Sequence, residues 1–309
     1  MSILCAVDFS ETSALALQCA REIADHHAQP LTIVTVVDPL LAAAEQVQAG
    51  AEATSVIRQS LARFVDEHVG SGRPAGQHLQ VRIGEVAPQV LEVARDAHAQ
   101  LLVMGTQGGT GVEKLMFGST AERLLRTTDR PVMVVPPAFG TSSRHVLGHL
   151  RHVLAPVDFH DHALDDARVA ARIAQASHAR LHLLHVLPDV GMTRWTIVQP
   201  LAAPQLAEQW QSAHVGRTES AMAALQRLVE ALELRDEPGI EVEEGNVADV
   251  ITKLTARLPV DLVVMGLRGA AAEHSGRVGS VAYRVLSQCP VPVLALPPQR
   301  SGQVLGFLG

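Results

Sequence analysis

Residues 101–120 read LLVMGTQGGTGVEKLMFGST and residues 262–281 read LVVMGLRGAAAEHSGRVGSV, and these two stretches decide the fold. In each stretch four apolar residues run into a glycine, a second glycine follows three positions later, and a Gly-Ser pair comes after nine more residues. A short apolar run before a glycine is typical of a buried strand, and a glycine loop that opens a helix is typical of an anion-binding turn. The sequence therefore predicts the same strand–loop–helix unit twice.

The repeat extends well beyond this unit. Ala6–Phe9 matches Pro156–Phe159, and residues 31–36 match residues 181–186. Beyond Val186 the spacing between the copies grows, which places an insertion in the second half, at Gly191–Trp210, where it is expected to form a loop or a lid. A chain of 309 residues suits two domains. We expect domain 1 at residues 1–138, a linker at 139–149, domain 2 at 150–299 and a C-terminal tail at 300–309.

Strand patterns alternate with helix patterns in both halves. Leu15, Cys19 and Ile23 follow helical spacing, and Ser10 is placed to cap that helix. In the first half we expect strands at 3–7, 31–37, 79–83, 101–104 and 131–135, and helices at 12–27, 42–69, 87–98 and 119–127. The second half repeats this order. Alternating β and α units predict an α/β fold with two doubly wound, parallel, five-stranded, Rossmann-like sheets in tandem.

The ends of the strands suggest where a ligand would bind. In an open α/β sheet, ligands bind beyond the carboxyl ends of the strands, at the switch point of the strand order. Asp8 ends the first strand, and its carboxylate can accept hydrogen bonds from a ribose hydroxyl or an adenine amino group. Backbone groups near Val36, at the end of the second strand, would line the base.

The glycine loop supplies the phosphate-binding part of this prediction. Gly105 and Gly108 allow the backbone to turn tightly and approach a phosphate. Ser119 and Thr120 stand where a helix begins, so their hydroxyls and the free N–H groups there can bind phosphate oxygens. We expect Gly105→Val or Gly118→Val to block the phosphate and to leave the fold intact.

The loop pattern G-x2-G-x9-G-[ST], the Asp that ends the first strand and the length of each half together resemble the universal stress protein family in its tandem form. The resemblance covers nearly all of both halves and implies an adenine nucleotide alpha hydrolase-like fold that binds ATP. The ATP-binding residues that it implies in the first half are Asp8, Val36, Gly105, Gly108, Gly118, Ser119 and Thr120. In the second half they are Asp158, Val186, Gly266, Gly269, Gly279 and Ser280. The resemblance also implies that the domains pair through their last strands, at 132–135 and 291–296.

The second half departs from the first at several of these positions. His160 replaces Ser10, and Val281 replaces Thr120, which removes a hydroxyl from the helix start. Arg268 and Arg277 enter the second loop, where they can neutralise a triphosphate. We expect ATP in both sites, with unequal affinity.

The sequence gives no pattern for a metal site within the protein. The chain contains 15 histidines, but no Cys/His set has zinc spacing. His145, His149 and His152 would share a face only if the linker were helical, and solvated histidines are the favoured interpretation. His185 is expected in the core. Mg²⁺ is expected only with ATP, bound through the phosphates and water.

The composition narrows the remaining possibilities. The net charge is -7 and no Lys/Arg stripe is present, so nucleic acid is not an expected partner. Hydrophobic residues make up 47% and aromatic residues 3%, which predicts aliphatic cores without a membrane span. Cys5, Cys19 and Cys289 form an odd, scattered set, which favours a reduced, cytoplasmic chain. The first residues read as a strand, not as a signal peptide.

Three functions remain open from the sequence. The first is an ATP-binding stress-response or regulatory protein without fast turnover, acting on an unidentified protein partner and able to form a homodimer. The second is an enzyme that hydrolyses ATP slowly or phosphorylates itself, although the Walker pattern G-x4-G-K-[ST] and a nucleophile–base set are absent. The third is a nucleotide-free dimerisation or interaction module. No catalytic residue is assigned.

Overall fold

The computed structural model describes residues 2–39, 52–70, 76–106, 118–141, 150–159, 162–189, 204–267 and 278–297. The helices and strands of the first half are β1 (Ser2–Ala6), α1 (Glu11–His26), β2 (Leu31–Val37), α3 (Glu52–Val69), β3 (Gln77–Ile83), α4 (Val86–Asp96), β4 (Ala99–Gly105), α5 (Ser119–Thr127), β5 (Val132–Val135) and a short 3-10 helix, η1 (Pro137–Thr141). Those of the second half are β6 (His152–Pro156), α6 (Ala163–Ala176), β7 (Arg180–Leu187), α8 (Pro204–Leu232), β8 (Gly239–Glu244), α9 (Val247–Arg257), β9 (Leu262–Gly266), α10 (Ser280–Gln288) and β10 (Val293–Leu296).

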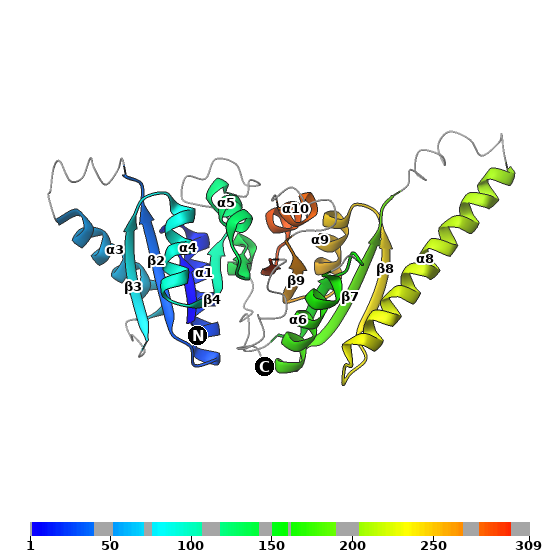
Figure 1. Cartoon of the computed structure of the whole chain (residues 1–309), viewed down its shortest axis with the longest axis horizontal. Helices are drawn as coiled ribbons and strands as arrows, with labels where there is room; N and C mark the ends of the chain where they lie inside the picture. The colour runs from blue at the N-terminus through cyan, green and yellow to red at the C-terminus, as the bar shows by residue number, and fades with distance from the viewer. Residues whose placement is uncertain are drawn as a thin grey trace.

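The strands form one continuous sheet in the order β3-β2-β1-β4-β5-β10-β9-β6-β7-β8 (Figure 1). Neighbours within each half are parallel, which confirms the predicted α/β fold. The two predicted five-stranded sheets are joined into this single sheet, because β5 and β10 pair antiparallel, as the expected pairing of the last strands requires. Val134 faces Val293 and Met133 faces Leu294 across this join. Both strands are buried and apolar, so leaving their edges unpaired would expose backbone groups that need partners.

Helices cover both faces of the sheet and explain the continuous apolar strands. In β1, Ile3 and Cys5 pack on the face covered by α1, α3, α6 and α8. Leu4, which points the other way, packs on the face covered by α4, α5, α9 and α10. A strand that is buried on both faces must be apolar at every position, and this is the pattern that the sequence shows.

Local sequence signals set the limits of α1. The Ser10 hydroxyl accepts a hydrogen bond from the Ser13 N–H at 3.2 Å, which confirms the predicted cap. Leu17 and Ile23 point from the helix into the core and are fully buried. The helix ends at His26, and Ala28 just beyond it adopts a left-handed conformation with φ 51°. Because Ser10 caps the start of α1, the turn between β1 and α1 is held in one conformation.

The second half differs most at α8, which reaches back into the insertion. Residues 191–203 lie outside the described residues, but Pro204–Trp210 form the start of α8. The expectation of a loop or lid is therefore wrong for this part. Proline suits the first turn of a helix, because its missing N–H would have no intrahelical partner there.

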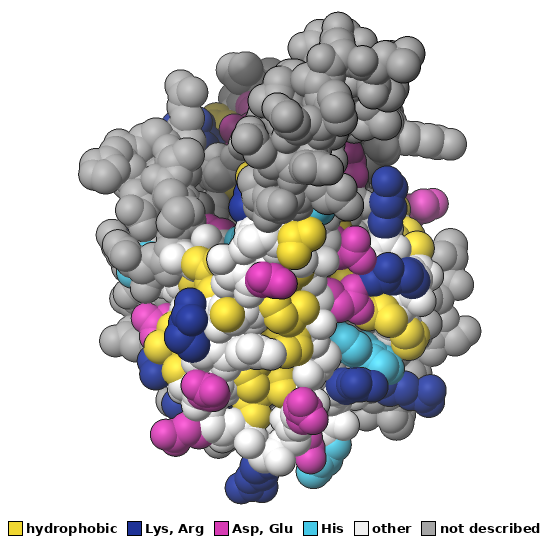
Figure 2. Space-filling model, turned by 90° about the vertical axis from the view of Figure 1, so that its right-hand side faces the viewer, with side chains coloured by type: hydrophobic (Ala, Val, Ile, Leu, Met, Phe, Trp, Pro, Cys, Tyr) yellow, Lys and Arg dark blue, Asp and Glu magenta, His cyan; other side chains and the backbone are white. Residues whose placement is uncertain are grey.

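Figure 2 shows the end of the molecule formed by α8 and β8, where apolar side chains gather among acidic and basic ones.

Candidate functional site

The switch point of the first half lies between β1 and β4. These strands are parallel neighbours, with Ile3 opposite Leu101 and Cys5 opposite Val103. Their connections run to opposite faces of the sheet, since α1 and α5 belong to different hydrophobic clusters. The carboxyl ends of β1 and β4 therefore lie at a switch point of the strand order, where ligands bind in open α/β sheets, and this edge is called the first crevice below.

Three of the predicted residues reach this edge of the sheet. Asp8 follows β1 and is exposed, and Gly105 ends β4. Ala6 lies opposite Val34, so the next residues of β1 and β2 bring Asp8 and Val36 to the same edge. The Val36 side chain is half-buried and packs on the α4 face, so only its backbone is suited to reading a ligand.

The two ends of the glycine loop are held together at the crevice. The Gly118 N–H donates to the Thr106 carbonyl at 3.2 Å, and the Thr106 N–H donates to the Val135 carbonyl at 3.2 Å. The second half repeats this device, because the Gly279 N–H donates to the Leu267 carbonyl at 3.0 Å. Residues 107–117 and 268–277, with the predicted Gly108 and Gly269, lie outside the described residues. Each loop thus leaves and rejoins the sheet at one point.

The helix that follows the loop begins with a bare N-cap. Gly118 is the N-cap of α5 and has no side chain with which to cap it. The first intrahelical bond runs from the Glu122 N–H to the Gly118 carbonyl at 2.9 Å, which leaves the N–H groups of Ser119, Thr120 and Ala121 outside the helical ladder. The Thr120 side chain is exposed beside them. Such a helix start is suited to binding an anion.

Asp8 is held in place by the cap of α1. Its carboxylate accepts hydrogen bonds from the Ser10 hydroxyl at 2.6 Å and the Ser10 N–H at 3.1 Å. Phe9 between them adopts φ 64°, a left-handed conformation that is uncommon for a bulky residue. Phe159 repeats this feature with φ 59° after Asp158. Strained residues persist where the surrounding structure holds them, and here the turn presents the aspartate at the crevice.

The glycines of the loop have different structural roles. A Cβ added at Gly105 would lie 2.9 Å from the backbone carbonyl carbon of Thr12, so the packing of α1 against β4 requires glycine at this position. The expectation that Gly105→Val leaves the fold intact is therefore wrong. A Cβ added at Gly118 would meet nothing closer than the Thr106 carbonyl oxygen at 3.9 Å. Gly118 is thus the position at which added bulk enters the crevice without disturbing the core.

Sequence reasoning missed Thr106 as a candidate site residue. Its side chain is 4% exposed, and its Oγ1 atom has no hydrogen-bond partner among the described residues. Leaving a hydroxyl buried without a partner is unfavourable, and buried polar groups in folded proteins are nearly always satisfied. A comparison of the two repeats could have pointed to Thr106, because the matching position of the second half holds the apolar Leu267.

The second crevice has the same framework with fewer polar groups. β6 and β9 are parallel neighbours, and Asp158 is exposed beyond β6. Gly266 ends β9, while Gly279 is the N-cap of α10 and Ser280 is its first residue. The Val186 side chain is buried on the α9 face. Val281 is 38% exposed on α10, where α5 has Thr120.

Histidines and cysteines do not add a reactive centre among the described residues. In that part of the chain, no group of three or more His, Cys, Asp or Glu side chains is arranged to hold a metal. Cys5, Cys19 and Cys289 are buried and unpaired. Burial raises the pKa of the Cys289 thiol to about 12 and raises the pKa of the other two thiols further, so none of them supplies a thiolate at neutral pH. No helix in the described residues has the length and hydropathy to cross a membrane.

The fold and the paired crevices define a tandem α/β protein with two glycine-loop sites. The chain belongs to the universal stress protein family, whose profile matches residues 1–136 and 149–297. A universal stress protein of Mycolicibacterium smegmatis is 24% identical over 308 residues, covering 96% of this chain and 97% of that protein. One from Thermus aquaticus is 32% identical over 146 residues, covering 46% of this chain and 95% of that protein. A crystal structure of a putative universal stress protein from Pseudomonas aeruginosa shares the fold, with a TM-score of 0.64, 17% identity, and coverage of 99% of this chain and 95% of that one.

Proposed function

We propose that this protein binds an adenine nucleotide, with ATP as the expected ligand, at the carboxyl ends of β1 and β4. The observation that carries the proposal is the buried Thr106 hydroxyl, which lies where both ends of the glycine loop meet and has no hydrogen-bond partner in the described part of the chain. A ligand with polar groups in the crevice would satisfy this hydroxyl. Membership of the universal stress protein family supports ATP as the first choice.

Each part of the crevice has a role in this proposal. The N–H groups at the start of α5 bind phosphate oxygens, because the positive end of the helix dipole lies there. Asp8 accepts hydrogen bonds from the ribose, and the backbone at Val36 reads the base. Gly118 leaves room for the phosphates, since a Cβ there would meet no described atom closer than the Thr106 carbonyl oxygen at 3.9 Å. The full proposed set is Asp8, Val36, Gly105, Gly108, Gly118, Ser119 and Thr120. Mg²⁺ would be bound through the phosphates and water.

The second crevice is proposed as the weaker site. Leu267 and Val281 replace the two threonines, which removes two hydroxyls from the neighbourhood of the phosphates. Its proposed ligand-binding residues are Asp158, Val186, Gly266, Gly269, Gly279 and Ser280. Each half with its crevice is proposed as one domain, at 1–138 and 150–299.

The proposed role is regulatory, in the cytoplasm and in the response to stress. ATP would stabilise one state of the protein, and a protein partner or a second copy of the chain would bind that state. Binding produces such a signal only if the two states differ in their affinity for ATP. Slow ATP hydrolysis or self-phosphorylation is the alternative within the same site, and a nucleotide-free interaction module is the alternative without it.

Calorimetric titration with ATP tests the proposal, with native mass spectrometry to count the bound nucleotides. Gly118→Val and Gly279→Val form a matched pair, because both glycines are N-caps in an extended conformation that any residue can adopt. Gly118→Val is expected to abolish the tighter site, and Gly279→Val the weaker one. Unchanged ATP binding in folded Gly118→Val protein would contradict the proposal. Phosphate release that grows linearly with time and is lost in Asp8→Asn would favour the enzyme.

A further inference from the structure

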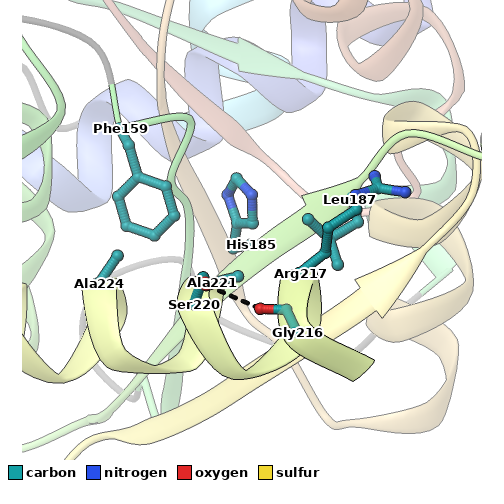
Figure 3. Close-up of a pocket in the computed structure, with 8 residues that line it drawn as sticks. All are labelled: Phe159, His185, Leu187, Gly216, Arg217, Ser220, Ala221 and Ala224. Atoms are coloured by element: carbon teal, nitrogen blue, oxygen red, sulfur yellow. Dashed lines mark hydrogen bonds between the residues drawn. The ribbon is translucent and has the colours of Figure 1, made fainter. Parts of the chain in front are cut away.

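A groove lies on the second half of the molecule, on the face of the sheet that α6 and α8 cover. Its volume is about 460 Å³. Figure 3 shows Phe159 and Leu187 on either side of the His185 ring, with α8 running below them. His185 and Leu187 project from β7 to this face, whereas Val186 between them packs on the opposite face. The lining residues are Phe159, His185, Leu187, Gly216, Arg217, Ser220, Ala221 and Ala224.

In the first half the counterpart of Phe159 packs against an aromatic side chain of the following helix. Phe9, the counterpart of Phe159, contacts the ring of Phe64 on α3 edge to face, with ring centroids 5.4 Å apart. Phe64 is 8% exposed, and His68 packs on its other side at 4.4 Å. In the second half the ring that contacts Phe159 is His185 of β7, with centroids 4.4 Å apart, and the α8 residues that line the groove beside it include Ala221 and Ala224. The α8 side of the groove is therefore lined by small side chains at these two positions.

One ring nitrogen of His185 is already hydrogen-bonded. Its Nδ1 atom lies 2.7 Å from the Val157 carbonyl oxygen. A carbonyl only accepts hydrogen bonds, so the Nδ1 atom donates this one. The His185 and Phe159 rings lie 4.4 Å apart at 36°. His185 is half-buried in the groove, which corrects its expected place in the core.

Arg217 and Gly216 complete the groove. The Arg217 guanidinium donates one hydrogen bond, to the Pro188 carbonyl at 3.2 Å, and has no further partner among the described residues. Gly216 lies inside α8, where glycine is an unfavourable residue, and a Cβ added to it would meet nothing within 4 Å. The chain thus keeps open space and a positive charge beside two aromatic rings.

We propose that this groove binds a small planar aromatic acid, with its ring against Phe159 and its anionic group at Arg217. Aromatic rings favour offset or edge-to-face contacts of the kind that Phe9 and Phe64 make. A planar guanidinium is well suited to binding a carboxylate. None of the lining residues belongs to the set proposed to bind the nucleotide, so the proposal does not depend on ATP binding.

The probe for this proposal is 2-naphthoate, titrated into the full chain with ATP-saturated protein as a parallel sample. A ligand of this size in an open groove is expected to bind with a Kd of about 1 mM. Gly216→Leu fills the groove and is expected to weaken binding at least about tenfold. Val215→Leu is the matched control, since it adds bulk to the neighbouring exposed position of α8 and should leave the Kd unchanged.

Two further measurements test the chemistry of the site. Arg217→Gln should weaken binding of 2-naphthoate and leave binding of neutral 2-naphthalenemethanol unchanged. The His185 ¹⁵Nε2 resonance should shift during the titration. Equal binding of cyclohexanecarboxylate, an equal loss of affinity in Val215→Leu, or displacement of 2-naphthoate by ATP would overturn the proposal.

Discussion

Replacing Thr106 with valine is expected to change the stability of the ligand-free protein and its affinity for ATP in opposite directions. The side chain is 4% exposed, and none of the residues that the structure describes offers its hydroxyl a hydrogen bond. Burying a hydroxyl without a partner costs about 1–3 kcal/mol, and valine has nearly the same shape without that polar atom. Thr106→Val is therefore expected to raise the free energy of unfolding by about 1 kcal/mol or more, which is about 2 °C in Tm for a chain of this size.

The same substitution is expected to weaken ATP binding. If the hydroxyl hydrogen-bonds to a nucleotide phosphate or ribose, its loss removes about 1–2 kcal/mol of binding free energy, or about tenfold in Kd. The two effects have opposite signs, which a general disturbance of the fold would not produce. Thermal unfolding without ATP and with a fixed excess of ATP measures both, because a ligand that binds only the folded state raises Tm with its occupancy.

Thr255→Val is the matched control for this experiment. Thr255 is 7% exposed, but its hydroxyl donates to the Thr252 carbonyl at 2.7 Å. Its replacement should lower stability by about 1 kcal/mol and leave ATP affinity unchanged. If Thr106→Val also lowers the stability of the ligand-free protein, the Thr106 hydroxyl already has a partner, and the reasoning from an unsatisfied group is refuted.

Gly105→Ala should lower the free energy of unfolding by about 1–3 kcal/mol, because its Cβ would overlap Thr12, whereas Gly118→Ala should change it by less than about 0.5 kcal/mol. Urea titrations of both variants check this, and similar losses would contradict it. The pKa of His182 is lowered below its ordinary value of 6.5, mainly by burial and further by the neighbouring His152 and Arg180. The His152 Nδ1 and His182 Nε2 atoms lie 2.9 Å apart. The unfolded chain then takes up a proton that the folded protein does not, so stability is constant above about pH 6.5 and falls as the pH drops through that value toward the lower folded pKa. Urea unfolding between pH 5 and 8 tests this, and His182→Asn should flatten the profile; an unchanged slope would count against it. Asn246 caps α9 by accepting from two backbone N–H groups at 3.1 and 3.3 Å, so Asn246→Ala should lose about 1 kcal/mol in thermal unfolding, and no loss would show that the cap is replaced.

The elements that could be predicted are those set by local pattern. The apolar run at Leu31–Val37 forms β2 with the predicted limits, and Ser10 caps α1 as expected. The predicted pairing of the last strands is confirmed by the β5–β10 ladder. These features depend on period, capping and family resemblance, all of which are present in the linear sequence.

The features that could not be predicted depend on contacts between distant positions. Nothing in the sequence indicates that Gly105 lies against Thr12, so its glycine was assigned to phosphate approach alone. Thr106 carries no motif, and its importance comes from burial without a partner. The groove beside Phe159 forms because one particular side of α8 faces β7. The spacing of apolar residues along α8 did not indicate which side that would be.

The antiparallel join of β5 and β10 has a consequence for how the two halves can change over time. Two separate copies paired in this way would share every substitution, so the partners would stay identical and would come together only as concentration allowed. Within one chain the partner is always present at a high effective concentration. Each half can then diverge alone, as the difference between Thr106 in the first half and Leu267 at the matching position of the second half shows. Covalent linkage thus permits a pseudo-symmetric pair to hold two different specificities.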